Sequence, residues 1–159
     1  MKKMVTLMAV HDKDWDHATQ YFEVVANEYW REDSKLSYVP ENFKQGSKVI
    51  WTIFDLQPGD SYRFKALLED IAEVYRQKKH DHSFVVYWNR FENKLGRDVA
   101  IESMFDNWAF FDKDMNMKED FEDVHGEGSW WKAIEEYRDI VISAEDEVSV
   151  LLPSMNGKQ

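Results

Sequence analysis

Residues 49–61 (VIWTIFDLQPGDS) decide the fold of this chain. Most of the first eight are β-branched or aromatic, a composition typical of a β-strand. They run into a proline-glycine turn and then into Asp60 or Ser61, either of which can cap a helix. The stretch therefore predicts a strand over 49–56 that turns directly into a helix.

The helix after this turn is expected over 61–79. Its apolar residues recur at three- and four-residue steps, so they share one face of a helix. The members of this stripe are Tyr62, Leu67, Leu68, Ile71, Val74 and Tyr75. The segment ends with Arg76, Lys78 and Lys79, and positive charges at a helix C-terminus interact favourably with the helix dipole.

A β-hairpin is expected next. Residues 83–91 (SFVVYWNRF) and 98–105 (DVAIESMF) have the composition of strands, and the residues between them include an Asn and a Gly that favour a turn. Side chains alternate across a strand, so Val99, Ile101 and Phe105 share one face of the second arm. This face is expected to belong to the core.

The C-terminal third supplies the last helix and strand. Residues 106–128 are acidic and irregular, Ser129 is expected to cap a helix, and 148–152 (VSVLL) is expected to form a strand. The helix is expected to carry Trp130, Ile134, Tyr137 and Val141. The order of elements is then β-α-β-β-α-β, which predicts an α+β, ferredoxin-like fold with an antiparallel sheet.

The first 48 residues are expected to extend this core. Residues 4–10 (MVTLMAV) fit either a short strand or the first turns of a helix. The apolar positions over 14–31 have helical spacing, and 32–47 contains the Pro, Gly, Ser and Asn of a connecting loop. A chain of 159 residues fits a single domain, with 1–48 as an N-terminal strand or helix extension and 49–153 as the core.

The composition excludes several partners and chemistries. The chain has 20 Lys and Arg against 31 Asp and Glu, a formal net charge of -11, so neither nucleic acid nor an anionic membrane surface is an expected partner. The absence of Cys excludes thiol catalysis and Cys-ligated metals. No run approaches the roughly 20 apolar residues that span a bilayer. Residues 4–10 are too short for an export signal, so a cytoplasmic location is expected if Met1 is the native start.

Residues 49–153 resemble the antibiotic-biosynthesis-monooxygenase-like group of dimeric α+β barrels. The resemblance rests on VIWTIFDLQPGD (49–60), FVVYWNRF (84–91) and DVAIESMFDNWAFFDKD (98–114). It implies that two four-stranded sheets pair face to face in a homodimer. Both faces of 49–56 are apolar, which agrees with a covered sheet, and internal cover by the N-terminal segment is the alternative.

The resemblance also implies a site for a small aromatic or apolar ligand. Cofactor-free oxygenases of this group hold an aromatic substrate between sheet and helices with Trp, Tyr, Asn and Arg side chains. The residues suited to this role here are Trp51, Tyr87, Asn89, Arg90, Glu102 and Trp108. An apolar cleft with a few converging polar groups is what such a site requires. The alternative is that these aromatics only pack the interior, and no cofactor is expected in either case.

A haem site is not expected, although some members of the group degrade haem. The counterparts of their Asn, Trp and His would be Asn89, Trp108 and His125. That family keeps the Asn on the first strand of the fold, and the strand over 49–56 contains no Asn. Trp108 is therefore interpreted as an aromatic of the core or of a corner.

Metal sites are not expected either. HDKDWDH (11–17) and HDH (80–82) bring ligand-type residues together but lack a recognised spacing. DKDMNMKEDFED (112–123) resembles a calcium loop, but it has Met117 at the position of the required Gly and Asp123 at the position of the required Glu. A solvated acidic loop is the better interpretation of this segment.

Two functions remain open from the sequence. The first is a small-molecule-binding or cofactor-independent oxygenase-like protein with a cleft between sheet and helices. The second is a non-enzymatic dimerising interaction module whose aromatic residues form core and interface. A solvent-connected cavity lined by the six site residues favours the first, and burial of these residues against a second chain favours the second.

Overall fold

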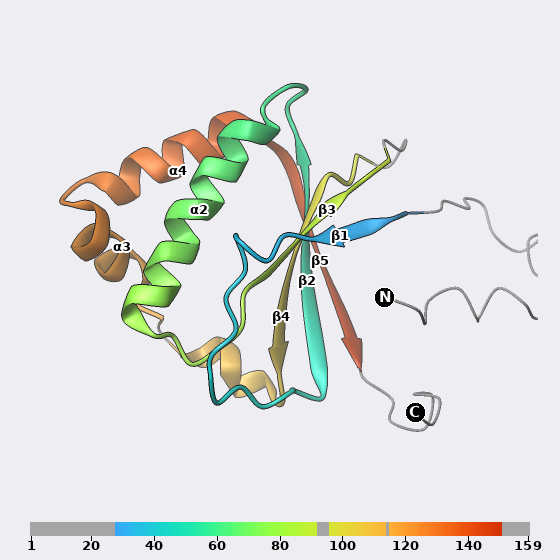
Figure 1. Cartoon of the computed structure of the whole chain (residues 1–159), viewed down its shortest axis with the longest axis vertical. Coiled ribbons are helices and arrows are strands. Elements are labelled where there is room, and N and C mark those ends of the chain that lie inside the picture. The colour runs from blue at the N-terminus through green and yellow to red at the C-terminus, as the bar shows by residue number, and fades with distance from the viewer. Residues whose placement is uncertain (1–27, 92–95, 114, 151–159) are drawn as a thin grey trace, which may run out of the picture.

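The computed structural model of the chain describes residues 28–91, 96–113 and 115–150. Within these ranges, three α-helices lie on one side of a five-stranded antiparallel sheet (Figure 1). The strands are β1 (Trp30–Glu32), β2 (Lys48–Leu56), β3 (Val85–Asn89), β4 (Val99–Phe105) and β5 (Val141–Val150). The helices are α2 (Ser61–Lys78), the short 3-10 helix η2 (Trp108–Asp112), α3 (Met117–His125) and α4 (Ser129–Ile140).

The strand order is β1-β3-β4-β2-β5, and each neighbouring pair is antiparallel. The hairpin of β3 and β4 folds back so that β4 lies between β3 and β2, while α2 connects β2 to β3. Without the short edge strand β1 and the additional helices η2 and α3, the elements follow the β-α-β-β-α-β order expected from the sequence. The described part is therefore an α+β fold compatible with the ferredoxin-like arrangement.

One face of the sheet forms the hydrophobic core with the helices. Phe54 of β2 and Val99 of β4 belong to the same buried cluster as Phe64 and Leu68 of α2. The rings of Phe54 and Phe64 lie 5.2 Å apart between their centroids. Burying one large apolar side chain stabilises a fold by about 1.5–3 kcal/mol, so these contacts fix α2 on the sheet.

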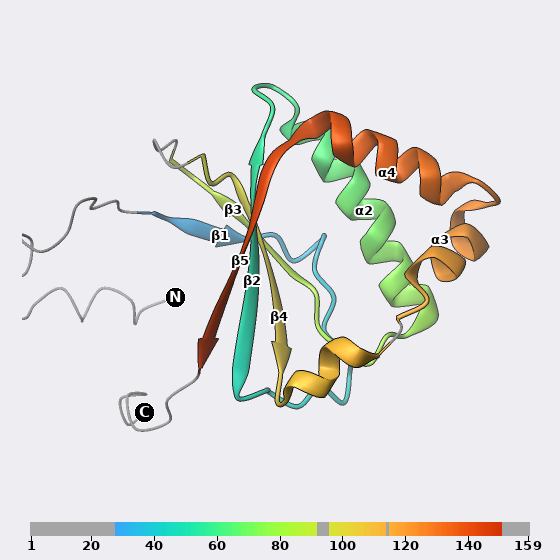
Figure 2. The same ribbon diagram turned by 180° about the vertical axis from the view of Figure 1, so that it is seen from behind.

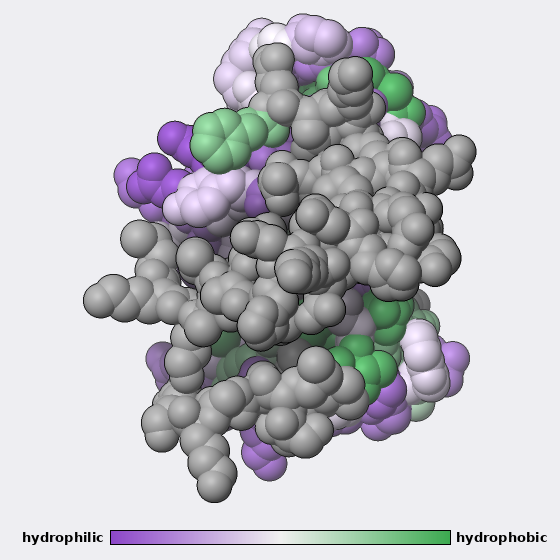
Figure 3. All heavy atoms as spheres, turned by 90° about the vertical axis from the view of Figure 1, so that its right-hand side faces the viewer, coloured by the Kyte–Doolittle hydropathy of each residue, from purple (hydrophilic) through white to green (hydrophobic). Residues whose placement is uncertain are grey.

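The opposite face of the sheet, called the outer face from here on, has none of the described helices on it, as the view from behind also shows (Figure 2). Because side chains alternate along β2, Val49, Trp51 and Ile53 point to the outer face while Phe54 and Leu56 point to the helices. Both faces of the strand are therefore apolar, as expected from the sequence of 49–56. Figure 3 views the molecule from this side and shows hydrophobic residues beside hydrophilic ones among the described residues.

The edge strand β1 corrects the expected end of the N-terminal helix. The sequence predicts a helix over 14–31, but Trp30–Glu32 pairs with β3, with Trp30 opposite Asn89. The edge of β3 offers backbone hydrogen-bonding groups to this segment, and such a tertiary partner overrides local helical spacing. Residues 28 and 29 are not helical either, residues 14–27 and the segment 4–10 lie outside the described residues, and the loop expected over 32–47 is confirmed from residue 33 onward.

The segment 106–128 is more regular than its composition suggests, because it contains η2 and α3. Phe121 is 2% exposed and anchors α3, with its ring 5.7 Å from that of Trp130 on α4. A single buried anchor among acidic residues produces no clear apolar stripe, which explains why the sequence did not indicate this helix. No helix in the described ranges combines the length and the apolar character needed to cross a membrane.

The last helix and strand are confirmed in kind, but their boundaries differ. The residue that precedes α4 in the cap position is Gly128, in a left-handed conformation with φ of 76°, rather than Ser129. The last strand begins at Val141 instead of residue 148, because β5 pairs with the whole length of β2, from Leu56 opposite Val141 to Lys48 opposite Val150. The polar composition of 143–147 does not indicate a strand, but the long partner strand β2 supplies backbone hydrogen bonds along this segment.

Candidate functional site

Three strands bring Trp51, Tyr87 and Glu102 together on the outer face, and these residues are called the outer-face cluster below. Trp51 of β2 is the direct cross-strand neighbour of Glu102 of β4. Tyr87 of β3 lies two residues from Val85, which is opposite Glu102 on the other side. The ring centroids of Trp51 and Tyr87 are 5.4 Å apart, and the Tyr87 hydroxyl donates a 2.8 Å hydrogen bond to Oε2 of Glu102.

Glu102 is an uncommon residue for the middle of a sheet, because it is only 7% exposed. Burial raises the pKa of its carboxyl; the hydrogen bond from Tyr87 acts in the opposite direction, and the charge of Glu32 raises it further. Among the described residues, no Lys, Arg or His forms an ion pair with Glu102. Burial, and then the bond to Glu102, also raises the pKa of the Tyr87 hydroxyl. The cluster therefore contains a carboxyl that keeps its proton to a higher pH than a free Glu.

The edge strand β1 adds one aromatic and one acidic side chain to the same face. Glu32 is the cross-strand neighbour of Tyr87, and Trp30 is that of Asn89. Since directly opposed residues in an antiparallel pair project to the same side, Trp30 and Glu32 border the outer-face cluster. Sequence reasoning missed both residues, because a strand of three residues is too short to give a usable alternation.

Asn89 holds the end of the β3–β4 hairpin. Its Nδ2 donates to the backbone oxygen of Arg97 at 2.8 Å, and its Oδ1 accepts from the backbone N–H of Phe91 at 3.2 Å. The Arg97 guanidinium in turn forms ion pairs with Glu147 at 2.6 Å and with Glu28 at 3.4 Å. Asn89 lies next to the cluster on the outer face, and its own polar atoms are engaged in shaping the turn.

The structure separates the other two predicted site residues from this cluster. Arg90 is exposed just after β3, where its backbone N–H donates to the oxygen of Tyr29 at 2.9 Å. Trp108 belongs to η2 and is 61% exposed, with its ring 5.4 Å from Phe105 and 6.0 Å from Phe111. Phe105 points to the helix side of the sheet, so Trp108 lies beyond the end of β4 rather than beside Glu102.

The predicted site residues do not line a cleft between the sheet and the helices. The layer between them contains tightly buried side chains such as Phe64 and Val86, which are 1% and 0% exposed. Tyr87 and Glu102 alternate along their strands with core residues such as Val86, so they must face the other way. The predicted site residues that lie close together, Trp51, Tyr87 and Glu102, therefore lie on the outer face.

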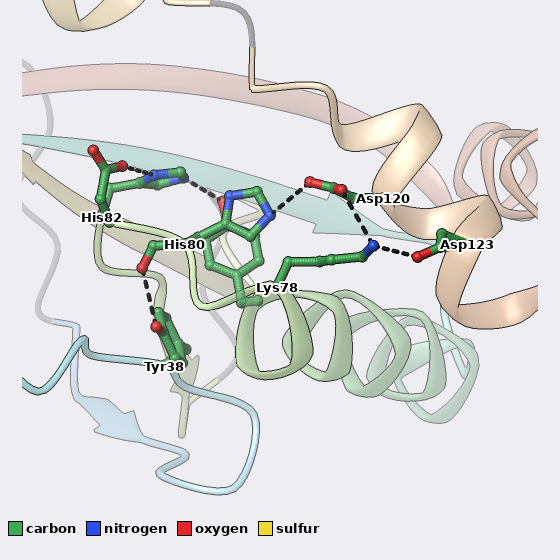
Figure 4. Close-up of polar contacts among 8 residues, drawn as sticks. Tyr38, Lys78, His80, His82, Asp120 and Asp123 are labelled. Carbon is green, nitrogen blue, oxygen red and sulfur yellow. Dashed lines mark hydrogen bonds and ion pairs between the residues drawn. The ribbon is translucent and has the colours of Figure 1, made fainter.

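A second polar group surrounds the turn that follows α2 (Figure 4). His82 is 7% exposed, and its Nε2 lies 3.0 Å from the Tyr75 hydroxyl while its Nδ1 lies 3.2 Å from Oδ1 of Asp81. Burial raises the pKa of Tyr75 to about 12. These contacts place one imidazole between a carboxylate and a phenol, and they tie the turn to α2.

His80 joins this group to α3. Its Nε2 lies 3.3 Å from Oδ2 of Asp120, and Lys78 forms ion pairs with Asp120 and Asp123 (Figure 4). Burial lowers the pKa of His80, the nearby His82 lowers it further, and Asp120 acts in the opposite direction. The contacts are those of a joint between two helices, which is a structural role.

Pockets of about 530, 300 and 240 Å³ border this turn, and Asp81 lines all three. In the described ranges, no group of three or more His, Cys, Asp or Glu residues is arranged to hold a metal ion. The segment 11–17 lies outside those ranges. The segment 112–123 is not one continuous loop, because α3 begins at Met117.

No protein-family model matches the chain, and neither a curated protein nor a solved structure matches it. A fold of this class hosts many functions, so a function for this chain has to be argued from the chemistry of the site. The outer-face cluster combines aromatic rings with a buried carboxyl that has no cationic partner among the described residues, whereas the polar groups near His82 are paired with one another.

Proposed function

We propose that the chain binds a small aromatic or apolar molecule at the outer-face cluster. Trp51 and Tyr87 offer ring surfaces for such a ligand, and Glu102 offers a polar atom that fixes its orientation. Asn89, Arg90 and Trp108, which the sequence interpretation included, are not required for this proposal.

The observation that carries the proposal is the state of Glu102. A carboxyl that is 7% exposed and lacks a cation among the described residues is costly to keep in a sheet. Groups with strongly perturbed ionisation are enriched at functional sites. The hydrogen bond from Tyr87 orients the carboxyl, and the Tyr87 ring lies 5.4 Å from that of Trp51.

The narrower form of the proposal is a cofactor-independent, oxygenase-like reaction, which the resemblance of residues 49–153 implies. In such a reaction Glu102 would accept a proton from a bound substrate. Its raised pKa suits this role, because a general base works best when its pKa approaches the operating pH. Binding alone is the broader proposal and is tested first.

Isothermal titration calorimetry on the full chain tests binding. The probes are 1-naphthol, 4-tert-butylbenzyl alcohol and trimethyl[4-(hydroxymethyl)phenyl]ammonium. We expect at least one probe to bind with a Kd below about 1 mM and Trp51→Leu to weaken it roughly tenfold. The control is Trp131→Leu on α4, whose side chain is 56% exposed and lies outside the cluster. Absence of binding by all three probes, or equal binding in both variants, contradicts the proposal.

A dimerising interaction module is the second candidate, and the edge strand β5 favours it. Ile142, Val148 and Val150 on this strand are 53%, 45% and 60% exposed. In the described part of the chain, β5 pairs with β2 alone, so its other edge has no partner strand. Exposed edges with apolar side chains favour association. In a dimeric α+β barrel, as implied by the resemblance, the outer faces of two copies would meet instead.

Analytical ultracentrifugation at micromolar concentration distinguishes these forms. A dimer that dissociates in Val148→Lys indicates association through the β5 edge. A dimer that dissociates only in Trp51→Glu indicates association through the outer face. A monomer throughout the concentration range contradicts the interaction module.

A further inference from the structure

We infer that the ligand of the outer-face cluster is an organic cation, held between the aromatic rings and the carboxylate of Glu102. The inference rests on the proposed small-molecule function and names the class of ligand for that same site.

The first argument is the missing counter-charge of Glu102. Among the described residues, the hydrogen bond to its carboxyl comes from the neutral hydroxyl of Tyr87, at 2.8 Å. Carboxylates removed from water are normally paired with a cation, because the desolvation cost is otherwise uncompensated. Among the described residues no side chain supplies that cation. A positively charged ligand would complete the pair.

The second argument is the geometry of the rings beside that carboxylate. The rings of Trp51 and Tyr87 lie in contact, with centroids 5.4 Å apart and planes inclined at 54°, so a ligand placed over one ring also lies near the other. The faces of Trp and Tyr rings attract cations through their quadrupole, and quaternary ammonium groups are commonly recognised in this way. Trp30 lies on the same face, opposite Asn89 on the neighbouring strand.

The third argument is the charge around the cluster. Glu32, opposite Tyr87, adds a second carboxylate to the same face. The guanidinium of Arg97, at the other end of the hairpin turn, is already paired with Glu147 at 2.6 Å. The net charge of -11 adds a long-range attraction for cations. An anionic ligand would be repelled by these carboxylates, and a neutral one would not stabilise the ionised form of Glu102.

A competition with protons follows from the same geometry. Without a ligand, burial favours the protonated form of Glu102 and raises its pKa. A bound cation favours the ionised form, so binding should release a proton, and the affinity should increase with pH. A permanently charged ligand has no titratable group, so a pH dependence of its affinity must come from the protein.

The test uses two probes of matched shape. Trimethyl[4-(hydroxymethyl)phenyl]ammonium carries a permanent charge, and 4-tert-butylbenzyl alcohol is its neutral counterpart. Calorimetry on the full chain at pH 7.5 should show the ammonium compound binding roughly tenfold more tightly. Glu102→Gln should remove most of this preference and leave the affinity for the neutral probe within about threefold.

A matched control separates a local effect from the overall charge. Glu135→Gln on α4 removes one negative charge, as Glu102→Gln does, but lies on the helix side of the sheet and is exposed. If Glu102→Gln does not fold, Glu32→Gln is the second variant, because Glu32 is exposed and borders the cluster. It should weaken ammonium binding about threefold and leave the neutral probe unchanged.

The outcomes distinguish this inference from the proposed function. Equal affinity for the two probes, with Trp51→Leu weakening both, would overturn the inference that the ligand is a cation but would retain the small-molecule site. An equal loss in Glu102→Gln and Glu135→Gln would show attraction by net charge alone and would also overturn it. A failure of both probes and of 1-naphthol to bind would overturn the proposed function itself. Tighter ammonium binding that rises with pH and depends on Glu102 would support the inference.

Discussion

Tyr87 and Glu102 are 15 residues apart in the chain, yet the Tyr87 hydroxyl lies 2.8 Å from the Glu102 carboxylate. The antiparallel register of β3 and β4 brings them together, because Val85 is directly opposite Glu102 and Tyr87 is directly opposite Ala100. The pair is diagonal, a spacing that long side chains can bridge. Both groups lie on the face of the sheet that is turned away from the described helices.

Loss of the Tyr87 hydroxyl should destabilise the protein. Tyr87→Phe leaves the Glu102 carboxyl without its hydrogen bond, and we expect the free energy of unfolding to fall by about 1–3 kcal/mol. The pKa of Glu102 should also rise, because this hydrogen bond is the contribution that lowers it. Urea denaturation measures the first effect and carbon-13 NMR of the carboxyl measures the second. Tyr62→Phe is the control, since Tyr62 is 70% exposed and its variant should match the wild type.

Stability should depend on pH through Glu102. Its folded pKa is raised above the ordinary value of 4.5, so the folded state binds a proton more tightly than the unfolded state. The contribution of this group to stability is therefore fully present below pH 4.5 and is lost as pH rises through the folded pKa. Glu102→Gln should gain stability relative to the wild type between pH 4.5 and 7.5. A constant difference across that range, measured by urea denaturation, would contradict the raised pKa.

The opposite pH dependence is expected for His80. Its folded pKa is lowered below 6.5, first by burial and then by His82, although Asp120 and Asp81 act in the other direction. The unfolded state then binds the proton more readily, so stability is fully present above pH 6.5 and is lost as pH falls through the folded pKa. His80→Gln should reduce this loss between pH 6.5 and 5. The measurement is the unfolding free energy of both proteins at half-unit steps of pH, and parallel curves would refute the assignment.

The helix α3 should depend on one aromatic side chain. Phe121 is 2% exposed and lies against His125 and Trp130, with ring centroids 4.6 and 5.7 Å away. Phe121→Ala should lower the free energy of unfolding by about 3–5 kcal/mol, because it leaves a cavity between α2, α3 and α4. Amide hydrogen exchange should show the greatest loss of protection in α3. The surface change Glu119→Ala, two residues away on the same helix, should leave stability nearly unchanged.

The core of the fold was predictable because its elements have strong local patterns. The strand over 49–56 and the helix over 61–79 are confirmed nearly residue by residue as β2 and α2. The strand composition of 49–56, the turn after it and the apolar stripe of 61–79 favour the same structure. Such agreement between local preferences and the overall fold is typical of a sequence that specifies one structure. The α3 segment lacks this agreement, since its one buried anchor lies among charged residues.

The sequence by itself determined the alternation of side chains along each strand, because the two-residue period of a strand depends only on local geometry. It also determined the α+β order of the core elements. Only the tertiary structure decided that Trp51, Tyr87 and Glu102 share the face opposite the helices and that β1 and β5 take the lengths they have. The physical reason is that register and face are set by contacts between segments far apart in the chain, and these contacts leave no trace in a local window of sequence.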